Sequence, residues 1–147
     1  MRALGRALGR ALLTPSTQAL VVAIKGELGA GKTTLVGGVL NAIGFAGPAR
    51  SPTYTLVESY ETPTRHIFHL DLYRLADPQE VEPLGLRDLL TPDAALLIEW
   101  PERGAGQIPA ADLTIEIEYF EEEVRDVTLT AGDQSGEALL RAILNVE

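Results

Sequence analysis

The residues between Gly26 and Thr33 have the types and the spacing of a loop that binds phosphate groups. They read Gly-Glu-Leu-Gly-Ala-Gly-Lys-Thr and match the pattern G-x-x-x-x-G-K-S/T without a gap. The glycines of such a loop let successive backbone N–H groups point at a β-phosphate, and the helix that follows directs its positive end at the same anion. The lysine reaches the β- and γ-phosphates, and the hydroxyl binds Mg²⁺. The pattern predicts ATP and Mg²⁺ as cofactors, contacted by Gly29, Ala30, Gly31, Lys32, Thr33 and Thr34.

Two acids stand where a nucleotide-hydrolysing enzyme needs a second polar group. Such a group supports Mg²⁺ or orients the attacking water, and it usually lies at the end of a neighbouring buried strand. Asp71 follows His69 and Leu70 near the end of a predicted strand, and Glu99 ends the apolar run 96–98. We predict that Asp71 and Glu99 are catalytic. The alternative for either acid is a solvated position at the rim of the sheet.

The apolar pattern predicts the elements that position these groups. Continuous apolar runs predict two buried strands, Ala19–Lys25 and Ala94–Trp100. Alternating patterns predict two antiparallel pairs, Thr53–Tyr60 with His66–Tyr73 and Asp112–Phe120 with Val124–Ala131. Helical segments are predicted at Lys32–Ile43 (stopped by Gly44), at Pro78–Leu90 (broken at Pro83 and Gly85) and at Gln134–Val146. Together they predict one domain, 1–147, with a three-layer α/β P-loop NTPase fold whose mixed sheet has parallel core strands and antiparallel additions.

The first thirteen residues allow two interpretations. Met1–Leu13 is rich in arginine and contains no acid, as a targeting peptide would be. Its arginines and leucines each recur every four residues, which is also the pattern of a short amphipathic helix. We favour the helix, because it runs almost directly into the first predicted strand.

Composition argues against several classes of function. The chain has 147 residues, 21 acids against 12 bases, and a net charge of −9. Proteins that bind nucleic acid unaided usually present a basic face, so direct binding of nucleic acid is not expected. No apolar run approaches the ~20 residues that cross a bilayer, so a membrane span is not expected either. The absence of cysteine excludes disulfides and thiolate metal sites and fits a cytosolic protein.

Four motifs, in this order and spacing, together resemble the TsaE family. They are Gly-Glu-Leu-Gly-Ala-Gly-Lys-Thr-Thr at 26–34, Ser-Pro-Thr-Tyr-Thr-Leu-Val-Glu at 51–58, His-Leu-Asp-Leu-Tyr-Arg at 69–74 and Ile-Glu-Trp-Pro-Glu at 98–102. The resemblance extends from about Leu8 to the final helix. It implies a cytoplasmic ATPase that acts with the TsaD and TsaB proteins in the bacterial synthesis of threonylcarbamoyladenosine on tRNA.

The resemblance also implies roles for single residues. Thr33 and Glu99 would hold Mg²⁺, and Asp71 would be needed for activity. Thr53 and Thr55 would lie in a switch-like segment near the γ-phosphate, or else be ordinary strand threonines. Members of the family usually carry a longer N-terminus with polar residues that help to hold the adenine. This chain starts inside the first helix, which leaves the base contacts and the preference for ATP over GTP open, with Arg125 as a loose positional match.

Three functions remain open at this point. An ATPase of this kind would be slow alone, because the transition state often needs an arginine supplied by a partner. Arg74 or Arg50 could serve instead, and the acidic surface would suit docking onto a basic partner face. A small-molecule kinase would need an acceptor pocket and a lid, for which the chain offers little room. A nucleotide-gated binding module would bind ATP without hydrolysing it.

Overall fold

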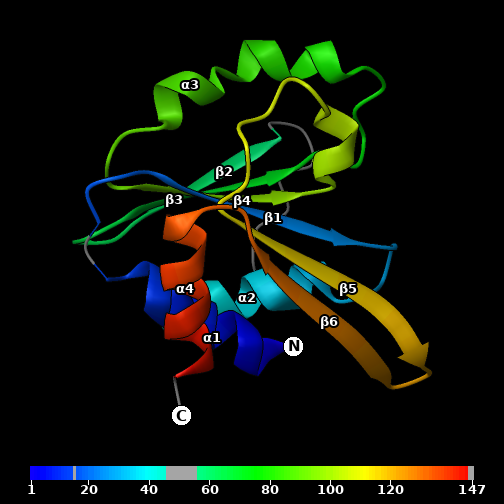
Figure 1. Ribbon diagram of the computed structural model, residues 1–147. Helices are drawn as coiled ribbons and strands as arrows, with labels where there is room; N and C mark the ends of the chain where they lie inside the picture. The colour runs from blue at the N-terminus through cyan, green and yellow to red at the C-terminus, as the bar shows by residue number, and fades with distance from the viewer. Residues whose placement is uncertain (15, 46–55, 146–147) are drawn as a thin grey trace.

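The structure is a computed structural model that describes residues 1–14, 16–45 and 56–145. Within these residues a six-stranded sheet of order β2-β3-β4-β1-β5-β6 lies between two layers of helices (Figure 1). The elements in chain order are α1 (Arg2–Leu12), β1 (Leu20–Gly26), α2 (Lys32–Ala42), β2 (Val57–Glu61), β3 (His66–Asp71), the 3₁₀ helix η1 (Pro78–Leu84), α3 (Leu86–Leu89), β4 (Ala94–Glu99), the 3₁₀ helix η2 (Pro101–Gly104), β5 (Leu113–Glu121), β6 (Val124–Ala131) and α4 (Gln134–Leu144).

The four central strands run parallel, and an antiparallel strand closes each edge of the sheet. β1 pairs in parallel with β4 on one side and with β5 on the other, and β3 pairs in parallel with β4. β2 and β6 pair antiparallel with β3 and β5. Every residue of β4 and the first five of β1 are buried, because helices cover both faces of this part of the sheet. The predicted α/β fold, with parallel core strands and antiparallel additions, is confirmed.

The two faces of the sheet have separate apolar cores. α1, α2 and α4 pack on one face, against side chains that include Val22, Ile24 and Ile115. η1 and α3 lie over the other face, near the side chains of Val21 and Leu96 (Figure 1). The alternation of side chains along each strand sends successive residues of one strand into different cores.

Helix α1 confirms the prediction of an amphipathic helix at the start of the chain. Its buried side includes Leu8 and Leu12, and it packs closely on α2. The close approach depends on Gly5, because a Cβ atom there would collide with the backbone oxygen of Leu35. Since α2 begins at the phosphate-binding loop, α1 supports the helix that carries Lys32.

The boundaries of several elements differ from those predicted. β3 ends at Asp71 rather than Tyr73, and β4 ends at Glu99 because Trp100 adopts a left-handed backbone, with φ 57°. The helical stretch that begins at Pro78 is broken at Gly85, as predicted, into η1 and α3, but it is not broken at Pro83, which lies inside η1. Strand β2 begins at Val57 and α4 ends at Leu144; residues 53–55 and Val146, which the predicted elements included, lie outside the described residues.

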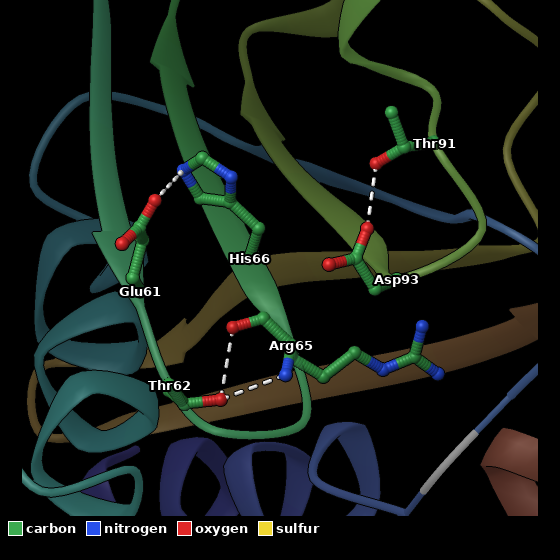
Figure 2. A network of polar contacts seen from close by, with 6 residues as sticks. All are labelled: Glu61, Thr62, Arg65, His66, Thr91 and Asp93. Carbon is green, nitrogen blue, oxygen red and sulfur yellow. Dashed lines mark hydrogen bonds and ion pairs between the residues drawn. The ribbon is translucent and has the colours of Figure 1, made fainter.

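Arg65 sits in the tight turn between β2 and β3. The hydroxyl of Thr62 accepts a hydrogen bond from the backbone N–H of Arg65 and donates one to its backbone oxygen, as Figure 2 shows. The guanidinium group is buried and donates to four backbone oxygens, those of Leu12, Thr14, Gln18 and Pro92. One side chain thereby fixes the end of α1, the connection to β1 and the loop before β4.

A second junction lies where β5 begins. The carboxyl of Asp112 accepts a hydrogen bond from the backbone N–H of Val21, at 2.7 Å, and shares another with Asp133. Asp133 in turn caps α4 by accepting from the N–H of Gly136. Burial, followed by the contact with Asp133, raises the pKa of Asp112 to about 6. The shared hydrogen bond holds the pKa of Asp133 below its usual value.

Replacing Arg65 with methionine should destabilise the protein by about 2–4 kcal/mol, because buried carbonyls lose a charged donor. Chemical denaturation would measure the free energy of unfolding. Arg10→Met is the matched control, since Arg10 is exposed on α1 and its change should stay within about 0.5 kcal/mol. Equal effects of the two substitutions would contradict the anchoring role of Arg65.

Asp112→Asn should remove a pH dependence of stability. Between the ordinary pKa of 3.8 and about 6, the folded protein keeps a proton on Asp112 that the unfolded chain has released. Raising the pH through this window therefore lowers the free energy of unfolding of the wild type. An asparagine amide can donate to Asp133 and accept from Val21 at any of these pH values.

The stability advantage of Asp112→Asn over the wild type should thus grow through that window and level off above it. Urea denaturation at a series of pH values would show this. Asp126→Asn, at an exposed position on β6, should show no such trend. A constant difference between Asp112→Asn and the wild type would refute the raised pKa.

Candidate functional site

The phosphate-binding loop connects β1 to α2, as the sequence predicts. Gly29 and Gly31 have positive φ angles of 81° and 118°, which glycine adopts without the strain that other residues incur. Gly31 is the N-cap of α2, so the positive end of that helix points at the loop. The loop also touches the β5–β6 hairpin, because the hydroxyl of Tyr119 donates to the backbone oxygen of Leu28 at 3.3 Å.

Lys32 is a buried cation that forms no ion pair with a carboxylate among the described residues. Its side chain is 4% exposed, and its Nζ donates to the backbone oxygens of Gly26 and Glu27 at 2.5 and 2.8 Å. Nζ also lies 4.3 Å from the centre of the Trp100 ring. Burial lowers the pKa of Lys32, and the charges of Glu99, Asp71 and Glu102 offset part of that effect. An ammonium group in these surroundings gains most from an anion that enters from solvent.

The two predicted acids lie side by side on neighbouring strands. Asp71 at the end of β3 is paired in register with Glu99 at the end of β4. Paired residues of parallel strands point to the same face of the sheet, and here that face is the one covered by α2. Glu99 is 2% exposed, whereas Asp71 is half-buried and accepts a hydrogen bond from the backbone N–H of Tyr73.

A pocket of about 210 Å³ collects nearly all of the predicted site residues. Its lining includes both acids and most of the loop: Leu28, Gly29, Gly31, Lys32, Thr33, Thr34, Asp71, Tyr73, Glu99 and Trp100. The remaining predicted residue, Ala30, does not line this pocket. It lines a neighbouring hollow of about 500 Å³, together with Met1 and Arg125.

Arg125 forms one wall of that neighbouring hollow. Its guanidinium group donates to the backbone oxygens of Glu121, Glu122 and Val124 in the hairpin turn, and it stacks 4.1 Å from the centre of the Tyr119 ring. Arg125, which the sequence suggested as a loose positional match for a nucleotide contact, therefore lies beside the loop.

Sequence reasoning missed two side chains at the site. His69 lies behind Glu99 and contacts its carboxylate. The sequence held a clue to this position: His69 comes two residues before Asp71 on the same strand, so the two side chains lie on one face of the sheet. Arg103 lies in η2, with its guanidinium 5.4 Å and 5.6 Å from the ring centres of Tyr73 and Trp100. That position depends on the left-handed turn at Trp100, which the sequence did not reveal.

One other predicted side chain, that of Arg74, does not join the site. Arg74 is exposed and does not line the pocket. Arg50, Thr53 and Thr55 lie outside the described residues. In the part of the chain that the structure describes, no helix is long and apolar enough to cross a membrane.

Comparisons with known proteins agree on one family. The family described as "Threonylcarbamoyl adenosine biosynthesis protein TsaE" matches residues 1–127. The tRNA threonylcarbamoyladenosine biosynthesis protein TsaE of Haemophilus influenzae is 44% identical over 142 residues, which cover 96% of this chain and 89% of that protein. The TsaE protein of Bacillus subtilis is 34% identical over 111 residues, covering 76% and 69%.

A solved structure shows the same fold. The crystal structure of Bacillus subtilis YdiB superposes with a TM-score of 0.71 at 23% identity, covering 98% of this chain and 89% of that one. The family match and the two close relatives together cover the phosphate-binding loop and both strands that end in the acids. The chain belongs to the TsaE family of threonylcarbamoyladenosine biosynthesis proteins.

Proposed function

We propose that this chain is a Mg²⁺-dependent ATPase that serves the synthesis of N6-threonylcarbamoyladenosine in tRNA. The pathway rests on the relatives, which are named as tRNA threonylcarbamoyladenosine biosynthesis proteins. The chemistry rests on one observation: a buried ammonium group and two strand-end carboxylates meet in the pocket at the phosphate-binding loop. We propose a cytoplasmic location with this role, as expected from the sequence.

Lys32 and the loop would bind the phosphate groups. Nζ of Lys32 would exchange the backbone oxygens of Gly26 and Glu27 for phosphate oxygens, which are stronger acceptors. The loop N–H groups and the start of α2 would add their partial positive charge. The hollow beside Ala30 and Arg125 would take the rest of the nucleotide, because it shares Gly29, Gly31 and Thr34 with the pocket.

The donor set fits Mg²⁺ held together with a nucleotide. The described residues contain no group of three or more His, Cys, Asp or Glu side chains that could hold a metal on their own. Mg²⁺ at nucleotide sites typically takes one or two carboxylates in addition to phosphate oxygens and water. The Thr33 hydroxyl and the Glu99 carboxylate would hold the ion, which when bound neutralises charge on the phosphate oxygens.

Asp71 would orient the attacking water. It is less buried than Glu99, and one of its oxygens is held by the backbone N–H of Tyr73. The carboxylate is thereby fixed at the pocket wall, where its second oxygen can accept a hydrogen bond from water.

Turnover by the protein alone would be slow. No arginine of the described chain lines the pocket, and an arginine at the transferring phosphoryl group is worth about 10³–10⁵ in rate. TsaD and TsaB, implied as partners by the family resemblance, would accelerate the reaction. The net charge of −9 suits docking onto a basic face of such a partner and disfavours direct contact with tRNA.

Phosphate release from ATP, measured with the protein alone and then with TsaB and TsaD added, tests this proposal. We expect a large stimulation by the partners. Glu99→Gln and Asp71→Asn should each reduce the stimulated rate by about 10²–10³, the loss typical of a group that acts in the transition state. Glu137→Gln, at an exposed acid on α4, should leave the rate unchanged.

Two other outcomes would replace the ATPase assignment. ADP that forms only when a small acceptor is supplied would identify a kinase. Nucleotide binding without any turnover, with Glu99→Gln and Asp71→Asn affecting affinity alone, would identify a nucleotide-gated binding module.

Binding of Mg·ATP should change the fluorescence of Trp100, the only tryptophan of the chain. The Lys32 ammonium now lies against its ring and would move to the phosphates. Lys32→Ala should abolish the change at moderate ATP concentrations. Lys25→Ala, at the exposed lysine just before the loop, should retain it. Unchanged emission of the wild type at saturating nucleotide would count against Trp100 as a pocket residue.

A further inference from the structure

His69 and Glu99 form a buried polar pair directly behind the pocket. Nε2 of His69 lies 2.6 Å from Oε2 of Glu99, and the two side chains are only 2% and 3% exposed. With the carboxylate ionised, as binding of a metal ion requires, Nε2–H of His69 is the donor. Glu99 lines the pocket, whereas His69 does not. His69 thus reaches the pocket only through Glu99.

The sheet register explains how the imidazole comes to hold this carboxylate. His69 is paired with Leu97, and Asp71 is paired with Glu99, so all four side chains share the face covered by α2. His69 therefore stands one pleat behind Glu99, on the neighbouring strand. From there the ring contacts the carboxylate from the interior of the protein, on the side away from solvent.

The contact distinguishes the two oxygens of Glu99. Oε2 is occupied by His69. Oε1 has no hydrogen-bond partner among the described residues. It is absent from the set of fully enclosed atoms without a partner, so it is not fully enclosed. Since Glu99 lines the pocket, Oε1 is the oxygen that remains open to it.

A gain in stability is a weak explanation for the pair. Nδ1 of His69 is enclosed and has no hydrogen-bond partner in the described part of the chain. The neighbouring side chains on this face, among them Ile67 and Leu97, are apolar and fully buried. A buried polar pair in such surroundings is often no more stabilising than two apolar residues of similar volume. The pair therefore calls for a functional reason.

We propose that His69 is a positioning residue that fixes the Glu99 carboxylate so that Oε1 faces the Mg²⁺ bound with the nucleotide. This inference rests on the proposed function of the pocket. A carboxylate held by one oxygen cannot rotate its other oxygen away from the ion, so less freedom is lost when the ion binds. Hydrogen-bond partners behind a metal ligand typically contribute about 10–100-fold in metal affinity.

The test separates metal affinity from nucleotide affinity. Mn²⁺, which is visible by electron paramagnetic resonance, is titrated into the full-length protein saturated with ADP. ADP affinity is measured separately in EDTA. His69→Leu should weaken Mn²⁺ binding about 10–100-fold and leave metal-free ADP affinity within about twofold. His69→Gln should restore most of the metal affinity, because its amide N–H can reach Oε2 as the imidazole does.

Thermal unfolding of the same variants checks that folding is not the cause. His69→Leu alone should be destabilised, because Glu99 loses its partner in the interior. The double variant His69→Leu/Glu99→Leu should be at least as stable as the wild type, although it does not bind Mn²⁺ with ADP. A double variant much less stable than the wild type would show that the pair serves stability and would overturn the inference.

The remaining outcomes separate this inference from the proposed function. Wild-type Mn²⁺ affinity in His69→Leu, with binding lost in Glu99→Gln, would overturn the role of His69 and leave the metal site standing. An equal loss of metal-free ADP affinity in His69→Leu would show that the whole pocket has collapsed, which also overturns it. Absence of Mn²⁺ binding by the wild-type ADP complex would overturn the proposed function, and this inference with it.

Discussion

The parallel pairing of β1, β3 and β4 determines where the polar groups of this molecule meet. Because the three strands run the same way, their carboxyl ends lie at one edge of the sheet. The phosphate-binding loop leaves the end of β1, Asp71 ends β3 and Glu99 ends β4. The same direction places the start of α2 beside these ends, so that the positive pole of the helix and the carboxylates share one pocket.

Several features of this pocket lower the stability of the fold. Lys32 and the His69–Glu99 pair are polar groups in the interior, and Trp100 has a left-handed backbone that costs about 1–2 kcal/mol for a non-glycine residue. The two apolar cores on either side of the sheet offset these costs. Lys32 is the clearest case, since two backbone oxygens, an aromatic face and the charges of nearby acids only partly offset the cost of burying its ammonium group.

Elements far from the loop in sequence hold it in place. α1 packs on α2 through Gly5, and Arg65 fixes the end of α1 by donating to the backbone oxygens of Leu12 and Thr14. On the other side, Tyr119 of the β5–β6 hairpin contacts the backbone of the loop at Leu28. The loop is therefore supported by α1, through α2, and by the β5–β6 hairpin.

The sequence alone determined the phosphate-binding loop, the two acids, the mixed α/β sheet and the family, because each depends on local patterns. A strand followed by a glycine-rich turn and a helix can be recognised within some twenty residues. The contact between His69 and Glu99, the place of Arg103 and the ends of β3 and β4 were decided only by the tertiary structure. They depend on the register between strands that lie 30 residues apart in the sequence, and on one left-handed residue, neither of which a local pattern specifies.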